Sequence, residues 1–91
     1  MKTDTYKKCK RIEEKLDYAH QFGYVTMLTD EKEIFFEAYK ETFDQELSRS
    51  QKSCPRCMIQ AVRRLWTEFD RFRNSPAGKK IDKDAKKEND S

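Results

Sequence analysis

The stretch that decides the fold is residues 54–73, CPRCMIQAVRRLWTEFDRFR. Its apolar side chains recur every three or four residues, the spacing that places them on one face of an α-helix: Cys57, Met58, Ala61, Val62, Leu65, Trp66, Phe69 and Phe72. Pro55 suits the first turn because the backbone N–H that it lacks would have no helical partner there. The sequence therefore predicts an amphipathic helix over residues 54–73, with Ser53 or Cys54 as its cap.

A second helical pattern precedes it over residues 30–47. Thr29 or Asp30 can cap its start, and the acidic residues that follow lie where the helix dipole favours negative charge. A broad apolar face then follows, formed by Ile34, Phe35, Ala38, Tyr39, Phe43 and Leu47. Because residues 48–53 are polar and rich in serine, we expect the helix to end near Leu47 and a linker to follow.

A third apolar stripe begins near the amino terminus and predicts a helix over residues 5–22. Its members are Tyr6, Cys9, Ile12, Leu16, Ala19 and Phe22. Gly23 can end this helix, since glycine tolerates the left-handed conformation that helix ends often require. Residues 24–28 have strand-like preferences, but no second strand is available to pair with them. We therefore expect residues 24–28 to be an extended connector packed on the helices.

The carboxyl-terminal residues 74–91 differ in composition from the rest of the chain. Residues 74–78 break the preceding helix, and residues 79–91 hold one aliphatic side chain, Ile81, among alternating charges. Such a segment buries too little apolar surface to offset the entropy lost on ordering. The predicted fold class is all-α: a small three-helix bundle in residues 1–73, with a disordered charged tail.

Composition limits the classes of protein to which the chain can belong. It has 91 residues, 35% of them hydrophobic and 41% charged, which is typical of one small soluble domain with a thin core. No apolar run is long enough to span a membrane, and the amino terminus is charged where a signal peptide is apolar. Three cysteines cannot all pair within one chain, so a reducing, cytoplasmic location is expected.

The pair Cys54 and Cys57 leaves three interpretations open. A redox couple at a helix start is one, although that chemistry normally has a strand and a sheet behind it. Zinc is another, but Cys9 and His20 would lie about 16 Å apart on one helix, so only one of them could join the site. An acidic residue or a second subunit would then have to supply the fourth ligand. The simplest interpretation is that of core or near-core thiols. No cofactor is expected, and zinc on Cys54 and Cys57 is the alternative.

Positive charge gathers on one side of the predicted helix over residues 54–73. Arg56, Arg63, Arg64 and Arg71 could follow the phosphates of a nucleic acid. However, residues 30–47 contain seven acidic and two basic residues, and this net charge of −5 could neutralise the arginines within the molecule. Nucleic-acid binding is therefore the alternative function rather than the first.

The sequence predicts a protein that binds and does not catalyse. It has no glycine-rich phosphate loop, its one histidine has no evident nucleophile and acid beside it, and its carboxylates are dispersed. Aromatic residues and arginine are enriched at interface centres. We therefore expect a protein–protein interaction or assembly module, with a protein partner or a second copy bound through Phe36, Tyr39 and Trp66. No membrane and no small-molecule substrate is expected.

Residues 28–66, LTDEKEIFFEAYKETFDQELSRSQKSCPRCMIQAVRRLW, carry a resemblance. An acidic helix, a short polar linker and a C-x-x-C that opens a final amphipathic helix resemble small accessory proteins of tailed bacteriophages and related mobile elements of gut bacteria. The resemblance implies a phage-encoded accessory protein, located in the host cytoplasm or in the virion. The residues to which it extends are Cys54 and Cys57.

Overall fold

The computed structural model describes the backbone of residues 1–89 and the side chains of residues 1–83. Within residues 1–89 the chain forms no strand and six helices: α1 (Thr3–Arg11), α2 (Glu13–Phe22), α3 (Thr29–Phe43), α4 (Arg49–Ser53), α5 (Pro55–Arg73) and α6 (Pro76–Asn89). The all-α prediction is confirmed. The prediction of three helices is wrong, because two of the expected segments are interrupted and a further helix follows α5.

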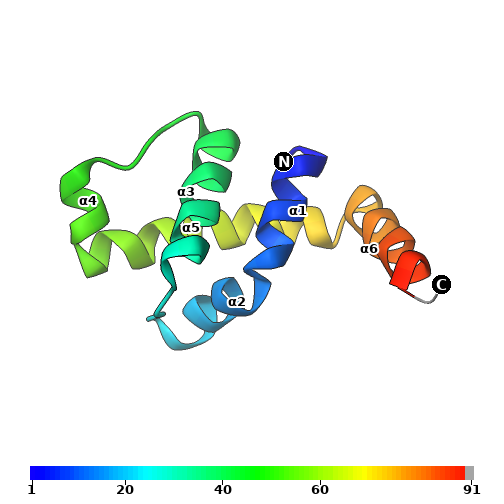
Figure 1. Ribbon diagram of the computed structural model, residues 1–91, viewed down its shortest axis with the longest axis horizontal. Coiled ribbons are helices and arrows are strands. Elements are labelled where there is room, and N and C mark those ends of the chain that lie inside the picture. Colours follow the sequence, from blue (N-terminus) through cyan, green and yellow to red (C-terminus); the bar gives the residue numbers. More distant parts are fainter. Residues whose placement is uncertain (90–91) are drawn as a thin grey trace.

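Helix α5 is the long central element of the molecule, and α1, α2 and α3 pack across it (Figure 1). The short helix α4 precedes its start, and α6 follows its end, so the structure is elongated, with dimensions of 44 × 24 × 21 Å. The core lies where the crossing helices meet α5. It consists of Tyr6, Cys9, Ile12, Leu16, Ala19, Met27, Phe35, Ala38, Tyr39, Ala61, Val62, Leu65 and Phe69.

Helix α5 forms where the sequence predicts it. Pro55 occupies its first turn, Cys54 is its cap, and the helix ends at Arg73. The Sγ atom of Cys54 accepts a hydrogen bond from the backbone N–H of Cys57 at 3.4 Å. These signals are local, which is why the sequence places this helix correctly.

The helix expected over residues 5–22 is interrupted at Ile12, which leaves the helical conformation with φ −117° and ψ 21°. Its first half, α1, packs mainly against α3, whereas its second half, α2, packs against α5. The break lets one apolar stripe face two different helices, since a straight helix presents its stripe in a single direction. Ile12 itself stays buried at the junction, while Phe22, the last predicted stripe residue, is 53% exposed.

The helix expected over residues 30–47 ends early, at Phe43. Asp44 adopts a left-handed conformation with φ 53°, and its N–H donates to the carbonyl of Lys40. Aspartate tolerates this conformation better than most residues, so it can end a helix. Leu47 still packs against the core from the loop that follows.

The serine-rich residues 48–53 were expected to be a linker, and most of them form α4 instead. Ser48 Oγ accepts a hydrogen bond from the Gln51 N–H at 3.1 Å, and Gln51 Oε1 accepts one from the Ser48 N–H at 2.8 Å. This is the reciprocal capping box that serine and a glutamine three residues later can make. The S-x-x-Q pattern was therefore a readable signal for a helix start.

The connector over residues 24–28 is extended and has no strand partner in the described part of the chain, as predicted. Its side chains alternate between two environments. Met27 is buried and Val25 packs against the core, whereas Tyr24 is 59% exposed and Leu28 is 71% exposed. The connector therefore covers the core with one side and presents apolar side chains to solvent with the other.

The tail that composition predicts to be disordered forms α6 as far as Asn89, and its last residues, 90–91, lie outside the described part. Pro76 begins the helix, and Ser75 Oγ accepts a hydrogen bond from the Gly78 N–H. A side chain at position 78 would clash with the carbonyl of Phe72, so glycine permits the close approach of α6 to α5. The hydroxyl of Tyr6 donates to the carboxylate of Asp82 at 3.1 Å. These tertiary contacts offset the entropy lost on ordering the segment. Composition alone does not show them.

Candidate functional site

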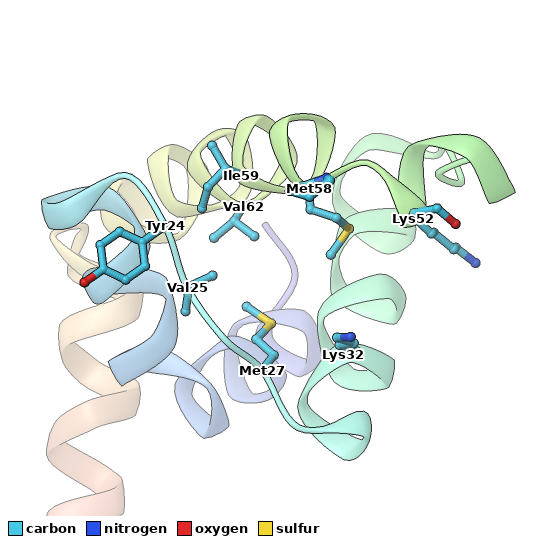
Figure 2. Close-up of a pocket in the computed structure, with 10 residues that line it drawn as sticks. Tyr24, Val25, Met27, Lys32, Lys52, Met58, Ile59 and Val62 are labelled. Atoms are coloured by element: carbon cyan, nitrogen blue, oxygen red, sulfur yellow. The ribbon is translucent and has the colours of Figure 1, made fainter.

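An apolar groove lies between the connector and the first two turns of α5. We call it the connector groove and define it by Tyr24, Val25, Met27, Met58, Ile59 and Val62. It has a volume of about 320 Å³. Figure 2 shows the side chains of Met27 and Met58 pointing toward one another from opposite sides of the groove. Methionine is flexible and polarisable, which suits a surface that adapts to the shape of what it binds.

Exposed aromatic side chains continue from one end of the connector groove onto α2. The hydroxyl of Tyr18 donates to that of Tyr24 at 2.9 Å, and the two rings meet edge to face with their centroids 5.4 Å apart. The ring of Phe22 lies 4.6 Å from that of Tyr18. With Leu28 at the other end of the connector, these are the large apolar side chains most exposed in the described part. Contiguous apolar surface of this kind marks interaction sites.

The three side chains predicted to form a protein interface each contact other parts of the molecule. Tyr39 is only 6% exposed, so its ring belongs mainly to the core. Phe36 is half-buried beneath the ammonium group of Lys52, which lies 4.7 Å from the centre of its ring. Trp66 stacks on His20 with ring centroids 3.5 Å apart, and its indole N–H donates to Asp17 at 2.8 Å. All three side chains thus already make contacts within the molecule, and less of their surface is left for a partner.

The residues of the connector groove were not singled out from the sequence. Tyr24, Val25 and Met27 were assigned only to a connector, and Ile59 lies outside the predicted stripe of its helix. One signal could have found Tyr24. An extended apolar segment with no strand partner leaves one of its sides uncovered, because its side chains alternate in direction, and Tyr24 lies on that side.

The four arginines of the predicted nucleic-acid face are all exposed on α5. At 100° per residue they fall within roughly a 100° arc of the helix. Two of the four arginines make contacts with other side chains of the molecule. The Arg64 guanidinium donates to the Tyr39 hydroxyl at 3.2 Å and lies over the ring of Phe43, and Arg71 pairs with Glu68 at 3.4 Å.

The acidic helix α3 does not neutralise these arginines by direct pairing. Glu37 and Glu41 pair with Lys8 of α1, and Glu46 pairs with Lys40. Among the side chains of residues 1–83, no carboxylate of α3 forms an ion pair with an arginine of α5. Glu37 and Glu41 of α3 therefore pair with a lysine of α1 and not with the arginine face.

A different arginine, Arg73, forms the main ion-pair network of the described side chains. Its guanidinium pairs with Asp70 on α5 and reaches Glu13 at 3.2 Å and Asp17 at 3.3 Å on α2. The sequence placed Arg73 only at the end of the helix, because its partners on α2 are about 60 residues away in the chain. This network joins α2 to the carboxyl-terminal end of α5.

The three thiols are free and differ in their surroundings. Burial raises the pKa of the Cys9 thiol to about 12, with a further contribution from the charge of Glu41, and its side chain lies in the core as predicted. Cys54 and Cys57 are half-buried. A hydrogen bond from the side chain of Cys57 lowers the pKa of Cys54, and the same bond raises the pKa of Cys57.

We expect alkylation by iodoacetamide in the folded protein to follow the order Cys54, Cys57, Cys9. Only the thiolate reacts, and below the ordinary thiol pKa a group of lower pKa holds more thiolate. Cys9 should react only as fast as the protein opens, because it is buried. Mass spectrometry of peptides after timed labelling measures the three rates separately. In denaturant the three rates should converge, and equal rates for Cys9 and Cys54 in the folded protein would contradict the structure.

The residues proposed for zinc do not converge with further ligands in the described part of the chain. No three histidine, cysteine, aspartate or glutamate side chains there are placed to hold one metal ion. Cys9 lies in the core and His20 stacks on Trp66. A zinc site on Cys54 and Cys57 would have to draw its remaining ligands from outside that part.

Comparisons with known proteins give no match. No family model, curated protein or solved structure matches this chain. The resemblance to phage accessory proteins therefore stays a prediction. Among the described residues, none of the helices combines the length and the apolar character needed to cross a lipid bilayer.

Proposed function

We propose that the protein is a small helical interaction module that binds a segment of a partner protein in the connector groove and performs no catalysis. The observation that carries the proposal is the groove itself. Its walls are apolar, and large side chains at both ends of the connector, Tyr24 and Leu28, are mostly exposed. A partner that covers them would remove apolar surface from water, the main favourable term in most protein association.

The chemistry of the groove lining favours a protein segment over a metabolite. A volume of about 320 Å³ lies at the lower end of the range for small-molecule pockets. Its lining includes the two lysines Lys32 and Lys52 at the edge, and it contains no cluster of titratable groups at its centre. It can accept a few large side chains, as expected for the anchor residues of a bound peptide segment. A phage-encoded accessory protein would use such a surface on a phage or host protein.

A photocrosslinking experiment in the source cell tests this function. Benzoylphenylalanine at Ile59, in the groove, should crosslink to one partner protein that mass spectrometry identifies, whereas the same label at the exposed Gln60 should not. The crosslink should disappear when Met58→Asp is added, because a charge in the groove opposes docking of apolar side chains. Equal labelling from both positions, or labelling that survives Met58→Asp, would refute the proposal.

Nucleic-acid binding is the second candidate, and one observation favours it. Glu37 and Glu41 of α3 pair with Lys8 of α1, and Arg56 and Arg63 have no carboxylate within ion-pair distance among the described side chains. Positive charge along one side of a helix is the form of a phosphate-binding surface.

Replacing Arg56, Arg63, Arg64 and Arg71 with glutamine tests the second candidate. If they neutralise phosphates of duplex DNA, affinity should fall, and the slope of log K against log salt should decrease by about 0.9 for each phosphate that is no longer neutralised. Fluorescence anisotropy at several salt concentrations measures both quantities. The matched control also removes four positive charges, by replacing Lys7 of α1 and Lys79, Lys80 and Lys83 of α6 with glutamine. Equal effects of the two variants, or none, would exclude an arginine-specific site.

A further inference from the structure

The charged side chains that line the connector groove are both lysines. Carboxylates lie just outside the lining, where Glu14 neighbours Tyr24 and Val25 and Glu31 accepts a hydrogen bond from the Leu28 N–H. Lys32 of α3 and Lys52 of α4 line its edge, and its lining includes no carboxylate. Arg56 follows the lining residue Pro55 in the first turn of α5. The guanidinium of Arg63 lies close to Gly23, beside the start of the connector. Of these cations, Lys32 lies on the α3 side of the groove and Arg63 lies beside the start of the connector.

These cations are largely uncompensated within the molecule. Among the described side chains, neither Lys32 nor Arg56 nor Arg63 has a carboxylate within ion-pair distance. The charge of Lys52 is partly compensated, because its ammonium group lies over the ring of Phe36 and near Glu46. An apolar groove with free cations at its edge is complementary to a ligand with apolar anchors and flanking negative charge.

We propose that the segment bound in the connector groove is an acidic peptide segment of the partner protein, with two or three large apolar side chains between carboxylates. The apolar side chains enter between Met27 and Met58, and the carboxylates face Lys32 on one side and Arg56 and Arg63 on the other. The proposal rests on the function proposed above and adds the chemistry of the partner. It also accounts for the arginines of α5 without a nucleic acid.

Selection from a displayed library of random 16-residue peptides against the full chain tests the proposal. Enriched peptides should combine Leu, Ile, Phe or Met with Asp and Glu, and the groove variant Met58→Asp should lose them. The double reversal Lys32→Glu with Arg56→Glu should bind the enriched peptides roughly tenfold more weakly, since exposed ion pairs contribute modestly and like charges repel. Selection against this reversed variant should enrich Lys and Arg instead. The matched control, Lys7→Glu with Lys79→Glu, changes the net charge equally on surfaces away from the groove and should leave affinity within about twofold.

The outcomes separate the two proposals. Groove-dependent apolar peptides without acidic enrichment, or equal effects of the two charge reversals, would overturn the acidic partner and leave the interaction module standing. No peptide sensitive to Met58→Asp would overturn both. Light scattering adds one further outcome: a stable dimer that Met58→Asp dissociates would assign the groove to a second copy and overturn the proposed partner. Circular dichroism and thermal unfolding of each variant show that the fold is retained.

Discussion

The Phe69→Ala variant is expected to lose about 3–5 kcal/mol of unfolding free energy, the usual cost of removing a fully buried aromatic ring. Phe69 is fully buried on α5, where its ring stacks against Tyr6 of α1 with centroids 5.4 Å apart. A chain of this size has roughly 5–14 kcal/mol in total, and a thin core favours the lower part of that range. The variant should therefore be partly or wholly unfolded at 37 °C.

Phe22→Ala provides a matched control for this prediction, because it makes the same chemical change at a ring that is 53% exposed. It should cost about 1 kcal/mol or less, mainly through the contact with Tyr18. Urea unfolding followed by circular dichroism at 222 nm measures both variants. Equal losses of stability at positions 22 and 69 would show that the core is not where α1 crosses α5.

The second large effect is expected at Arg73, which pairs with Glu13 and Asp17 of α2 and with Asp70 of its own helix. Arg73→Met keeps most of the side-chain length but removes the positive charge, which leaves three carboxylates facing one another. We expect a loss of roughly 1.5–3 kcal/mol, the range for hydrogen bonds to charged groups. The side chain is 25% exposed, so solvent screens this network only in part.

Arg71→Met is the control for this variant, since Arg71 lies two residues earlier on α5, its side chain is 73% exposed, and among the side chains of residues 1–83 it pairs only with Glu68. Its cost should be within about 0.5 kcal/mol of zero. The difference between the two variants should also shrink in 1 M NaCl, because salt weakens repulsion among partly exposed carboxylates. A loss at position 71 as large as at position 73 would contradict the network described here.

Part of the candidate site could be predicted from the sequence and part could not. The sequence placed the exposed arginines on one side of α5, because helical periodicity alone fixes which residues share a face. It could not show that the carboxylates of α3 pair with Lys8 instead of with those arginines. That choice depends on α3 packing against α1 at the edge that carries Glu37 and Glu41. Which charges remain free for a partner is therefore a tertiary property.

The sequence by itself determined the elements whose signals are local. Pro55, the cap at Cys54 and an unbroken apolar stripe define α5, and the apolar stripes before it place most of the core. A helix of this kind is specified by neighbours three or four residues apart, so no knowledge of the rest of the chain is required.

Only the tertiary structure decided the break at Ile12, the helical state of residues 76–89 and the existence of the connector groove. Each depends on contacts between segments far apart in the chain. One stripe must face both α3 and α5, Asp82 of α6 must meet Tyr6 of α1, and the connector must lie beside the start of α5. The free energy of such contacts comes from surfaces that only the folded chain brings together. A local sequence pattern does not show which surfaces those are.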